Sequence, residues 1–141
     1  MTTIAYNHKD KQIACDSRTT NNGVITSDKT NKMQIINGVR FWFTGVVADQ
    51  RKFTAMYFGE KCGDYTPECN AYAYDGELLY CGVTNEGELW KEPVLCDHSS
   101  GSGGNFALSG LLMGMTAKQA VAHAMQLDIY SGGKIRVFDV K

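Results

Sequence analysis

Short apolar stretches separated by polar turns fill the first 44 positions of the chain. Residues 2–7 and 12–16 are predicted to be two strands of a hairpin, because β-forming residues flank the polar turn Lys9-Asp10-Lys11. Residues 17–23 are predicted to be a loop. Further strands are expected at 24–26, 32–36 and 39–44.

Two Asn-Gly dipeptides mark tight turns in this region. Asn22-Gly23 and Asn37-Gly38 both stand next to predicted strands. Two-residue hairpin turns of the favoured type need positive φ at both central positions, and asparagine and glycine adopt it most readily. This part of the chain therefore predicts an antiparallel sheet.

The pattern changes after Gly45. Apolar residues recur at helical spacing from Val46 to Tyr57, which predicts a helix of about three turns. Residues 59–75 contain glycine, proline and two cysteines without a clear period, so we predict an irregular segment there. Strands are then expected at 77–83 and 88–92, with 94–97 as a further candidate.

Two helices are predicted near the C-terminal end. The serine- and glycine-rich run 98–104 opens a helix of small and apolar residues that ends at Met113. Thr116 and Gln119 form a capping box, in which the two side chains satisfy free amides of the first helical turn. This second helix is expected to run to about Tyr130.

Residues 135–138 are predicted to be the last strand. The expected element order is therefore strands, helix, strands, two helices and strand, which is typical of an α+β protein. At 141 residues the chain has the length of one domain, 1–141, with room for a hydrophobic core.

Composition and charge exclude several classes of partner. The chain is 43% hydrophobic and 21% charged, as expected for a globular protein. Its net charge of −1 gives no broad basic field, which argues against nucleic acid as a partner. No apolar run is long enough to span a bilayer, and the polar N-terminus does not resemble a signal peptide. We therefore expect a cytoplasmic protein without a membrane partner.

The five cysteines are odd in number and include no CxxC pair. This pattern predicts neither a disulfide framework nor a zinc knuckle. Reduced thiols fit the expected cytoplasmic location. Nothing in the sequence calls for a catalytic metal or an organic cofactor.

Candidate chemistry lies at the start of the chain, in Met1-Thr2-Thr3 considered together with Lys32. Removal of Met1, which methionine aminopeptidases are expected to perform before a small residue, would free the Thr2 amine. Thr2 would then carry a hydroxyl nucleophile and an amine base, and a free α-amino group has a pKa of roughly 7.7–8.0. A lysine ammonium nearby would lower that pKa by like-charge repulsion.

Six segments carry a resemblance through their common order and spacing, although each alone has an ordinary explanation as a surface charge, a strand end, a linker or a helix cap. They are Thr2-Thr3-Ile4, Asp16-Ser-Arg18, Lys32, Gly45-Val-Val-Ala-Asp49, Gly101-Ser-Gly103 and Asp128-Ile-Tyr-Ser-Gly-Gly133. Together they resemble the proteasome β-subunit and HslV family of N-terminal nucleophile (Ntn) hydrolases.

The resemblance implies a four-layer αββα sandwich of two antiparallel sheets. The sequence departs from the family in one respect. After Gly45 it has room for one short helix and the irregular segment 59–75, where family members have two long helices. We therefore expect a reduced helical layer in that part of the fold.

The resemblance also implies a threonine-type peptide hydrolase. Thr2 Oγ would attack a peptide carbonyl, and the Thr2 amine would carry the proton. Lys32 would tune the amine and help the hydroxyl ionise, Asp16 would pair with Lys32, and the Gly45 amide would serve the oxyanion hole. The polar set that orients the Thr2 amine would be Ser102, Asp128 and Ser131.

A pocket for the residue before the cleaved bond is implied as well. It would be partly apolar with one cation at its rim, which predicts no sharp preference. Its lining would be Thr19, Thr30, Phe43, Val47 and Arg51.

Three functions remain open at this stage. The leading one is a peptidase that works as a self-assembling homo-oligomeric ring on peptides or unfolded proteins, with an AAA+ unfoldase as a candidate partner. An Ntn amidase acting on small amides is the second, and a monomer or dimer would favour it. A non-catalytic assembly subunit is the third, and the intact set of Thr2, Asp16 and Lys32 argues against it.

Overall fold

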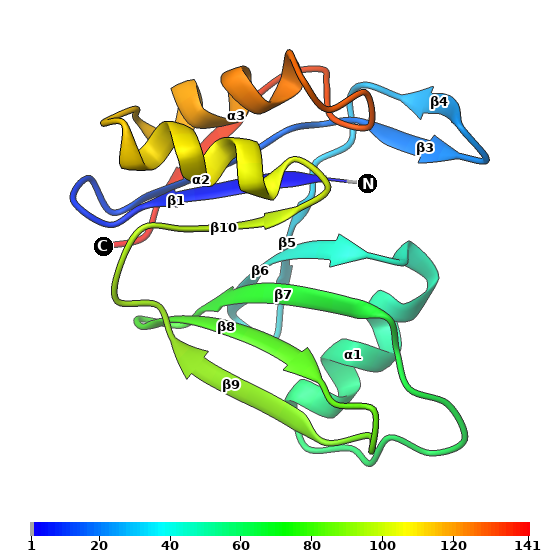
Figure 1. The fold of residues 1–141 in the computed structure, drawn as a ribbon. Helices are drawn as coiled ribbons and strands as arrows, with labels where there is room; N and C mark the ends of the chain where they lie inside the picture. The colour runs from blue at the N-terminus through cyan, green and yellow to red at the C-terminus, as the bar shows by residue number, and fades with distance from the viewer. Residues whose placement is uncertain (1) are drawn as a thin grey trace. The chain divides into compact units, whose positions relative to one another are not determined.

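The structure is a computed structural model that describes residues 2–141, in two compact units (Figure 1). The first unit consists of the chain up to Lys32 together with Leu95–Lys141, and the second is Met33–Val94. The predicted single domain 1–141 stays a prediction, and each unit is described by itself.

An antiparallel sheet of order β10-β1-β2-β11 forms the first unit, with β1 at its centre. A separate two-stranded ribbon, β3-β4, follows β2. The strands are β1 Thr3–Asn7, β2 Gln12–Cys15, β3 Thr19–Asn21, β4 Val24–Ser27, β10 His98–Gly101 and β11 Arg136–Asp139.

Helices α2 (Gly104–Leu112) and α3 (Ala117–Met125) lie together on one face of this sheet (Figure 1). The core between them is made largely of small side chains, with Ala5 and Ala14 from the sheet and Ala107 and Ala120 from the helices. Small residues let the helix backbones approach the sheet closely. This packing holds β1, which begins at Thr3, against the two helices.

The second unit is a five-stranded antiparallel sheet of order β5-β6-β7-β8-β9. The short 3-10 turn η1 (Val47–Asp49) and helix α1 (Gln50–Tyr57) follow β6, and α1 packs on the sheet through aromatic contacts of Phe53 and Tyr57. The strands are β5 Met33–Ile36, β6 Val39–Gly45, β7 Cys69–Tyr74, β8 Leu78–Val83 and β9 Leu89–Pro93.

The predicted turns and helix start are confirmed. Both Asn-Gly dipeptides join paired strands with positive φ at each residue, 51° and 77° at Asn22 and Gly23 and 50° and 79° at Asn37 and Gly38. The capping box of Thr116 is complete. The α+β class is confirmed, and within the described residues only η1 and α1 stand between β6 and β7, as expected for a reduced helical part.

Several boundaries differ from the predictions. The predicted loop 17–23 contains strand β3, and the predicted irregular segment 59–75 contains strand β7. The run 98–104, predicted to open a helix, begins with strand β10, and 94–97 forms no strand. Helix α3 ends at Met125, five residues before Tyr130, because the chain turns there through the hydrogen bonds from Leu127 and Asp128 amides to the Ala124 carbonyl.

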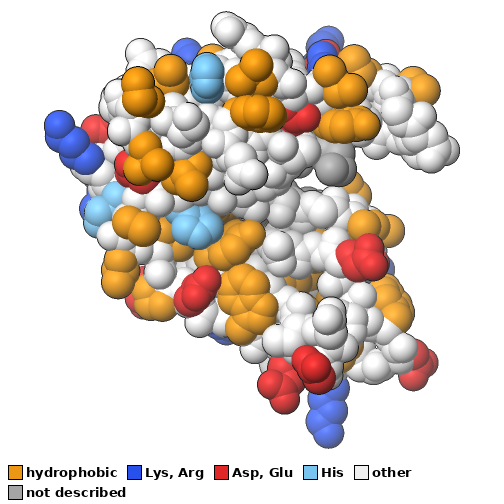
Figure 2. All heavy atoms as spheres, viewed as in Figure 1, with side chains coloured by type: hydrophobic (Ala, Val, Ile, Leu, Met, Phe, Trp, Pro, Cys, Tyr) orange, Lys and Arg blue, Asp and Glu red, His pale blue; other side chains and the backbone are white. Residues whose placement is uncertain are grey.

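The surface carries interspersed charges. Figure 2 shows lysine, arginine, aspartate and glutamate side chains scattered over the face in view rather than gathered by sign. None of the helices in the described part of the chain is both long and apolar enough to cross a membrane.

Candidate active site

Asp16 is the centre of the site. It directly follows β2, is fully buried, and its carboxylate accepts four hydrogen bonds. Oδ1 accepts from the Lys32 ammonium at 2.8 Å and from the Thr3 amide at 3.0 Å. Oδ2 accepts from the Gly132 amide at 3.0 Å and the Arg18 amide at 3.3 Å. A buried carboxylate with this many donors is held in one orientation.

Lys32 joins this carboxylate to the start of the chain. Its side chain is only 6% exposed, and its Nζ lies 3.0 Å from Thr2 Oγ1 as well as 2.8 Å from Asp16 Oδ1. Lys32 follows the loop after β4, and a hydrogen bond from the Thr30 amide to the Ser17 carbonyl holds that loop against the end of β2. A cation therefore stands in direct contact with the Thr2 hydroxyl.

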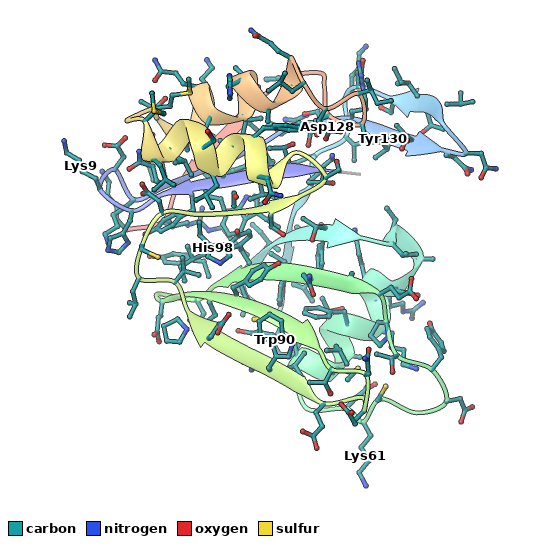
Figure 3. The ribbon with its side chains drawn as sticks, in the orientation of Figure 1. Lys9, Lys61, Trp90, His98, Asp128 and Tyr130 are labelled. Carbon is teal, nitrogen blue, oxygen red and sulfur yellow. The ribbon has the colours of Figure 1, made fainter. Side chains whose placement is uncertain are left out.

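A second carboxylate, Asp128, lies in the turn after α3 (Figure 3). Its Oδ2 accepts from the hydroxyls of Ser102 and Ser131, each at 2.6 Å, and its Oδ1 accepts from the Tyr130 amide at 3.2 Å. Burial acts to raise the pKa of Asp128, but these three hydrogen bonds outweigh it and lower the pKa below its ordinary value. Asp128 is therefore a carboxylate at neutral pH.

The Ser102 loop brings this second cluster to Thr2. Thr3 pairs with Gly101 across β1 and β10. The Thr2 carbonyl accepts from the Gly103 amide at 3.5 Å, and Ser102 Oγ lies 3.4 Å from the same oxygen. Gly101 has φ +97°, and a Cβ there would overlap the Thr2 carbonyl. Glycine is required at this position because both the backbone conformation and the close approach exclude a side chain.

Arg18 fastens two of the loops that carry the site. Its guanidinium pairs with Asp28 at 2.8 Å and donates to the Ile129 carbonyl at 3.1 Å. The first contact holds the loop that leads to Lys32, and the second holds the turn between Asp128 and Ser131. The family resemblance includes Arg18 without implying a role for it.

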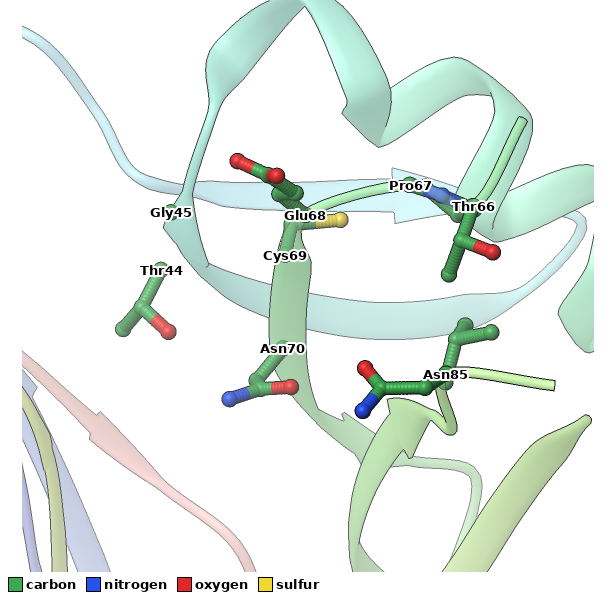
Figure 4. A pocket seen from close by; sticks show the side chains of 9 residues that line it. Thr44, Gly45, Thr66, Pro67, Glu68, Cys69, Asn70 and Asn85 are labelled. Carbon is green, nitrogen blue, oxygen red and sulfur yellow. The ribbon is translucent and has the colours of Figure 1, made fainter. Parts of the chain in front are cut away.

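The Gly45 position belongs to the second unit, at the end of β6. Gly45 has φ +100°, and a Cβ there would lie 2.5 Å from the Glu68 carbonyl oxygen, so only glycine fits. It borders a pocket of about 250 Å³ (Figure 4). The other lining residues are Thr44, Thr66, Pro67, Glu68, Cys69, Asn70, Val83 and Asn85. The oxyanion role of Gly45 stays a prediction.

The residues predicted to line the substrate pocket are divided between the units. In the first unit, the hydroxyls of Thr19 and Thr30 lie 3.3 Å apart. In the second, Val47 is 66% exposed and Arg51 is also exposed. Phe43 is 2% exposed, stacks on Phe41 and meets Phe53 edge to face, so its side chain forms part of the core of that unit.

Three of the cysteines are unsuited to act as nucleophiles. Burial raises the pKa of Cys15, Cys69 and Cys81 to about 12 in each case, so these thiols stay protonated. No group of three or more His, Cys, Asp or Glu side chains with the spacing of a metal site is found among residues 2–141.

The fold described above is that of the proteasome-type Ntn hydrolases, as comparison with solved structures shows. HslV from Trypanosoma brucei superposes with a TM-score of 0.71 over 97% of this chain and 98% of its own, at 19% identity. BPH from Thiobacillus denitrificans in complex with epoxomicin superposes with a TM-score of 0.70 over 99% of this chain and 100% of its own, at 14% identity. A second BPH structure superposes with a TM-score of 0.69 over 99% of each chain, at 15% identity.

The sequence itself matches no protein-family model and no curated protein. At identities below 20% the structural likeness establishes the fold. The chemistry then depends on the geometry around Thr2, Asp16 and Lys32.

Proposed function

We propose that the protein is a threonine-type peptide hydrolase that acts through Thr2. The observation that carries this proposal is the position of the Lys32 ammonium, 3.0 Å from Thr2 Oγ1 and 2.8 Å from Asp16. The ion pair with Asp16 already satisfies the charge of the buried Lys32 ammonium, so its contact with the Thr2 hydroxyl is not required for the stability of the fold. It does stabilise the negative charge that develops on that oxygen as it loses its proton.

The reaction requires a free Thr2 amine. Met1 lies outside the described residues, and its removal is part of the proposal. The neutral amine accepts the proton of the Thr2 hydroxyl while Oγ attacks the peptide carbonyl. The amine then returns that proton to the departing peptide nitrogen, which leaves an ester between Thr2 and the substrate. Water hydrolyses the ester with the same amine as base, and the hydroxyl is regenerated.

Other residues of the site have supporting roles in this scheme. Asp16 holds Lys32 through the 2.8 Å ion pair. Ser102, Asp128 and Ser131 orient the amine as a connected polar set. The scheme uses groups of the chain alone. The pocket role of Thr19, Thr30, Phe43, Val47 and Arg51 stays a prediction.

Peptide or unfolded protein is the proposed substrate. One of the similar BPH structures is a complex with epoxomicin, which supports a ligand-binding site in a protein of this fold. We further propose a cytoplasmic homo-oligomeric ring, with an AAA+ unfoldase as a candidate partner. An amidase for small amides remains the alternative if the protein is a monomer or dimer, and a non-catalytic subunit is the alternative if no substrate is cleaved.

The test is hydrolysis of a panel of fluorogenic peptides and small fluorogenic amides, together with the molecular mass in solution. We expect cleavage of peptides, little cleavage of the small amides, and a mass of several subunits. Epoxomicin should inhibit the peptide cleavage. Preference for the small amides by a monomer would favour the amidase. Absence of any cleavage by protein that has lost Met1 would contradict the proposal.

A further inference from the structure

Thr3, the residue next to the proposed nucleophile, has a buried hydroxyl with one short contact among the residues that the structure describes. The side chain is fully buried, and Oγ1 lies 2.6 Å from Ser131 Oγ. The Thr3 amide donates to Asp16 at 3.0 Å. Thr3 therefore contacts both polar clusters of the site, the Asp16–Lys32 pair through its backbone and the Asp128 set through its side chain.

The direction of the Thr3–Ser131 hydrogen bond follows from counting protons. A serine hydroxyl has one proton to donate and two lone pairs that accept. Ser131 donates its proton to Asp128 Oδ2 at 2.6 Å. In the contact between Thr3 and Ser131, Thr3 must therefore be the donor. One of the two Ser131 lone pairs is then occupied, and one is left.

We propose that Thr3 is a positioning residue of the active site, whose hydroxyl donates to Ser131 and leaves it one acceptor position for the Thr2 amine. This inference rests on the proposed function, because it assumes that Ser131 contacts the amine. A hydroxyl that donates to a carboxylate and accepts from Thr3 has its orientation fixed, and it can then accept an N–H bond in one direction only.

The surroundings of Thr3 indicate that its hydroxyl has a specific role and that the side chain does more than fill space in the core. A Cβ added at Gly103 would overlap Thr3 Oγ1 and would lie 3.2 Å from Asp128 Oδ2. The Gly103 backbone therefore forms the wall against the Thr3 hydroxyl and limits its rotation toward other partners.

Thr3 should also affect the pH dependence of hydrolysis. When it donates to Ser131, Ser131 becomes a stronger donor to Asp128 and a weaker acceptor for the amine. Loss of the Thr3 hydroxyl makes Ser131 a better acceptor for the protonated amine, which raises the pKa of that amine. The amine must be neutral to act as base, so the acid limb of the activity profile should move to higher pH.

The other charged groups around this cluster stay in place when the Thr3 hydroxyl is removed. Asp16, which follows β2, accepts from the Thr3 amide, and Lys32 is paired with Asp16. Arg18 reaches the Ile129 carbonyl and is paired with Asp28. None of these four side chains uses Thr3 Oγ1 in a hydrogen bond among the described contacts, so their own interactions are unchanged.

The test compares Thr3→Val, which removes the hydroxyl at nearly the same volume, with Thr3→Ser, which keeps it. At pH 7, kcat for peptide hydrolysis by Thr3→Val should fall about three- to tenfold with KM little changed. Its acid limb should move up by roughly half a pH unit, so the loss shrinks at high pH. Thr3→Ser should restore both values.

Thr54→Val is the matched control. Thr54 is another buried threonine, in α1, where its hydroxyl donates to the Gln50 and Arg51 carbonyls. This variant also loses one buried hydroxyl, and it should keep the wild-type pH profile.

The outcomes separate the inference from the proposed function. If Thr3→Val loses the same fraction of kcat at every pH, or loses none, Thr3 has no positioning role. Hydrolysis by the wild type would still support the proposed function in that case. If Thr3→Val fails to fold, Thr3→Ser with a shifted limb would still contradict the inference. Absence of hydrolysis by the wild type itself would refute the proposed function on which the inference rests.

Discussion

Thr2→Ala is expected to lower kcat for peptide hydrolysis by at least about 10³-fold, because it removes the attacking oxygen. In the structure the Thr2 hydroxyl accepts one hydrogen bond, from Lys32, and Lys32 retains its 2.8 Å contact with Asp16 when that hydroxyl is lost. The variant should therefore remain folded, with a thermal unfolding midpoint close to that of the wild type. Initial rates at saturating peptide measure the effect.

Thr2→Ser is the matched control for this prediction. It keeps the hydroxyl and the amine and loses only a methyl group, so a substantial part of the activity should remain. Turnover by Thr2→Ala at the wild-type rate would eliminate Thr2 as the nucleophile. Equal loss in both variants would point to a packing role for the threonine methyl group.

Lys32→Met is expected to lower kcat by about 100-fold or more, because the developing charge on the Thr2 oxygen loses its nearest cation. It should also lower the free energy of unfolding by about 3 kcal/mol, since it leaves the buried Asp16 carboxylate without its ion-pair partner. The three amide donors of Asp16 remain, which keeps the stability loss at the lower end of the usual range. Initial rates at saturating peptide measure the change in kcat, and urea titrations measure the change in the free energy of unfolding.

Lys29→Met is the control for this second prediction. Lys29 lies three residues earlier in the chain and is exposed, so its substitution should change neither the rate nor, by more than about 0.5 kcal/mol, the stability. Normal activity of Lys32→Met would show that the 3.0 Å contact with Thr2 has no catalytic role.

Local signals in the sequence predicted those elements whose structure is decided locally. The Asn-Gly turns require positive φ within two residues, and the capping box of Thr116 is complete within four. Strand β10 was missed because its residues, His98–Gly101, have little β propensity. This strand exists because it pairs with β1, nearly a hundred residues away in the chain.

Strand β7 was missed for a related reason. Ala71 and Ala73 face the core between larger residues, and these small side chains hide the alternation that a strand normally shows. The bulky partners that make these alanines suitable, such as Phe41 opposite Ala73, lie on another strand. Packing across the sheet, rather than propensity, determines the structure of this segment.

The site shows the same limit. The resemblance brought Asp16, Lys32, Ser102, Asp128 and Ser131 into consideration, and the structure gathers them around Thr2 and Thr3. The bond between Thr3 and Ser131 spans 128 positions of the chain, and no local pattern predicts it. Its donor direction becomes clear only when the contacts of Ser131 are known together.

Intact-mass analysis of the protein fraction that hydrolyses peptides is the most direct measurement. Thr2 can supply both the nucleophile and the base only if its amine is free. The account predicts that the active species is lighter than the translated chain by one methionine residue and begins at Thr2. Full turnover by a homogeneous species that still carries Met1 would contradict it.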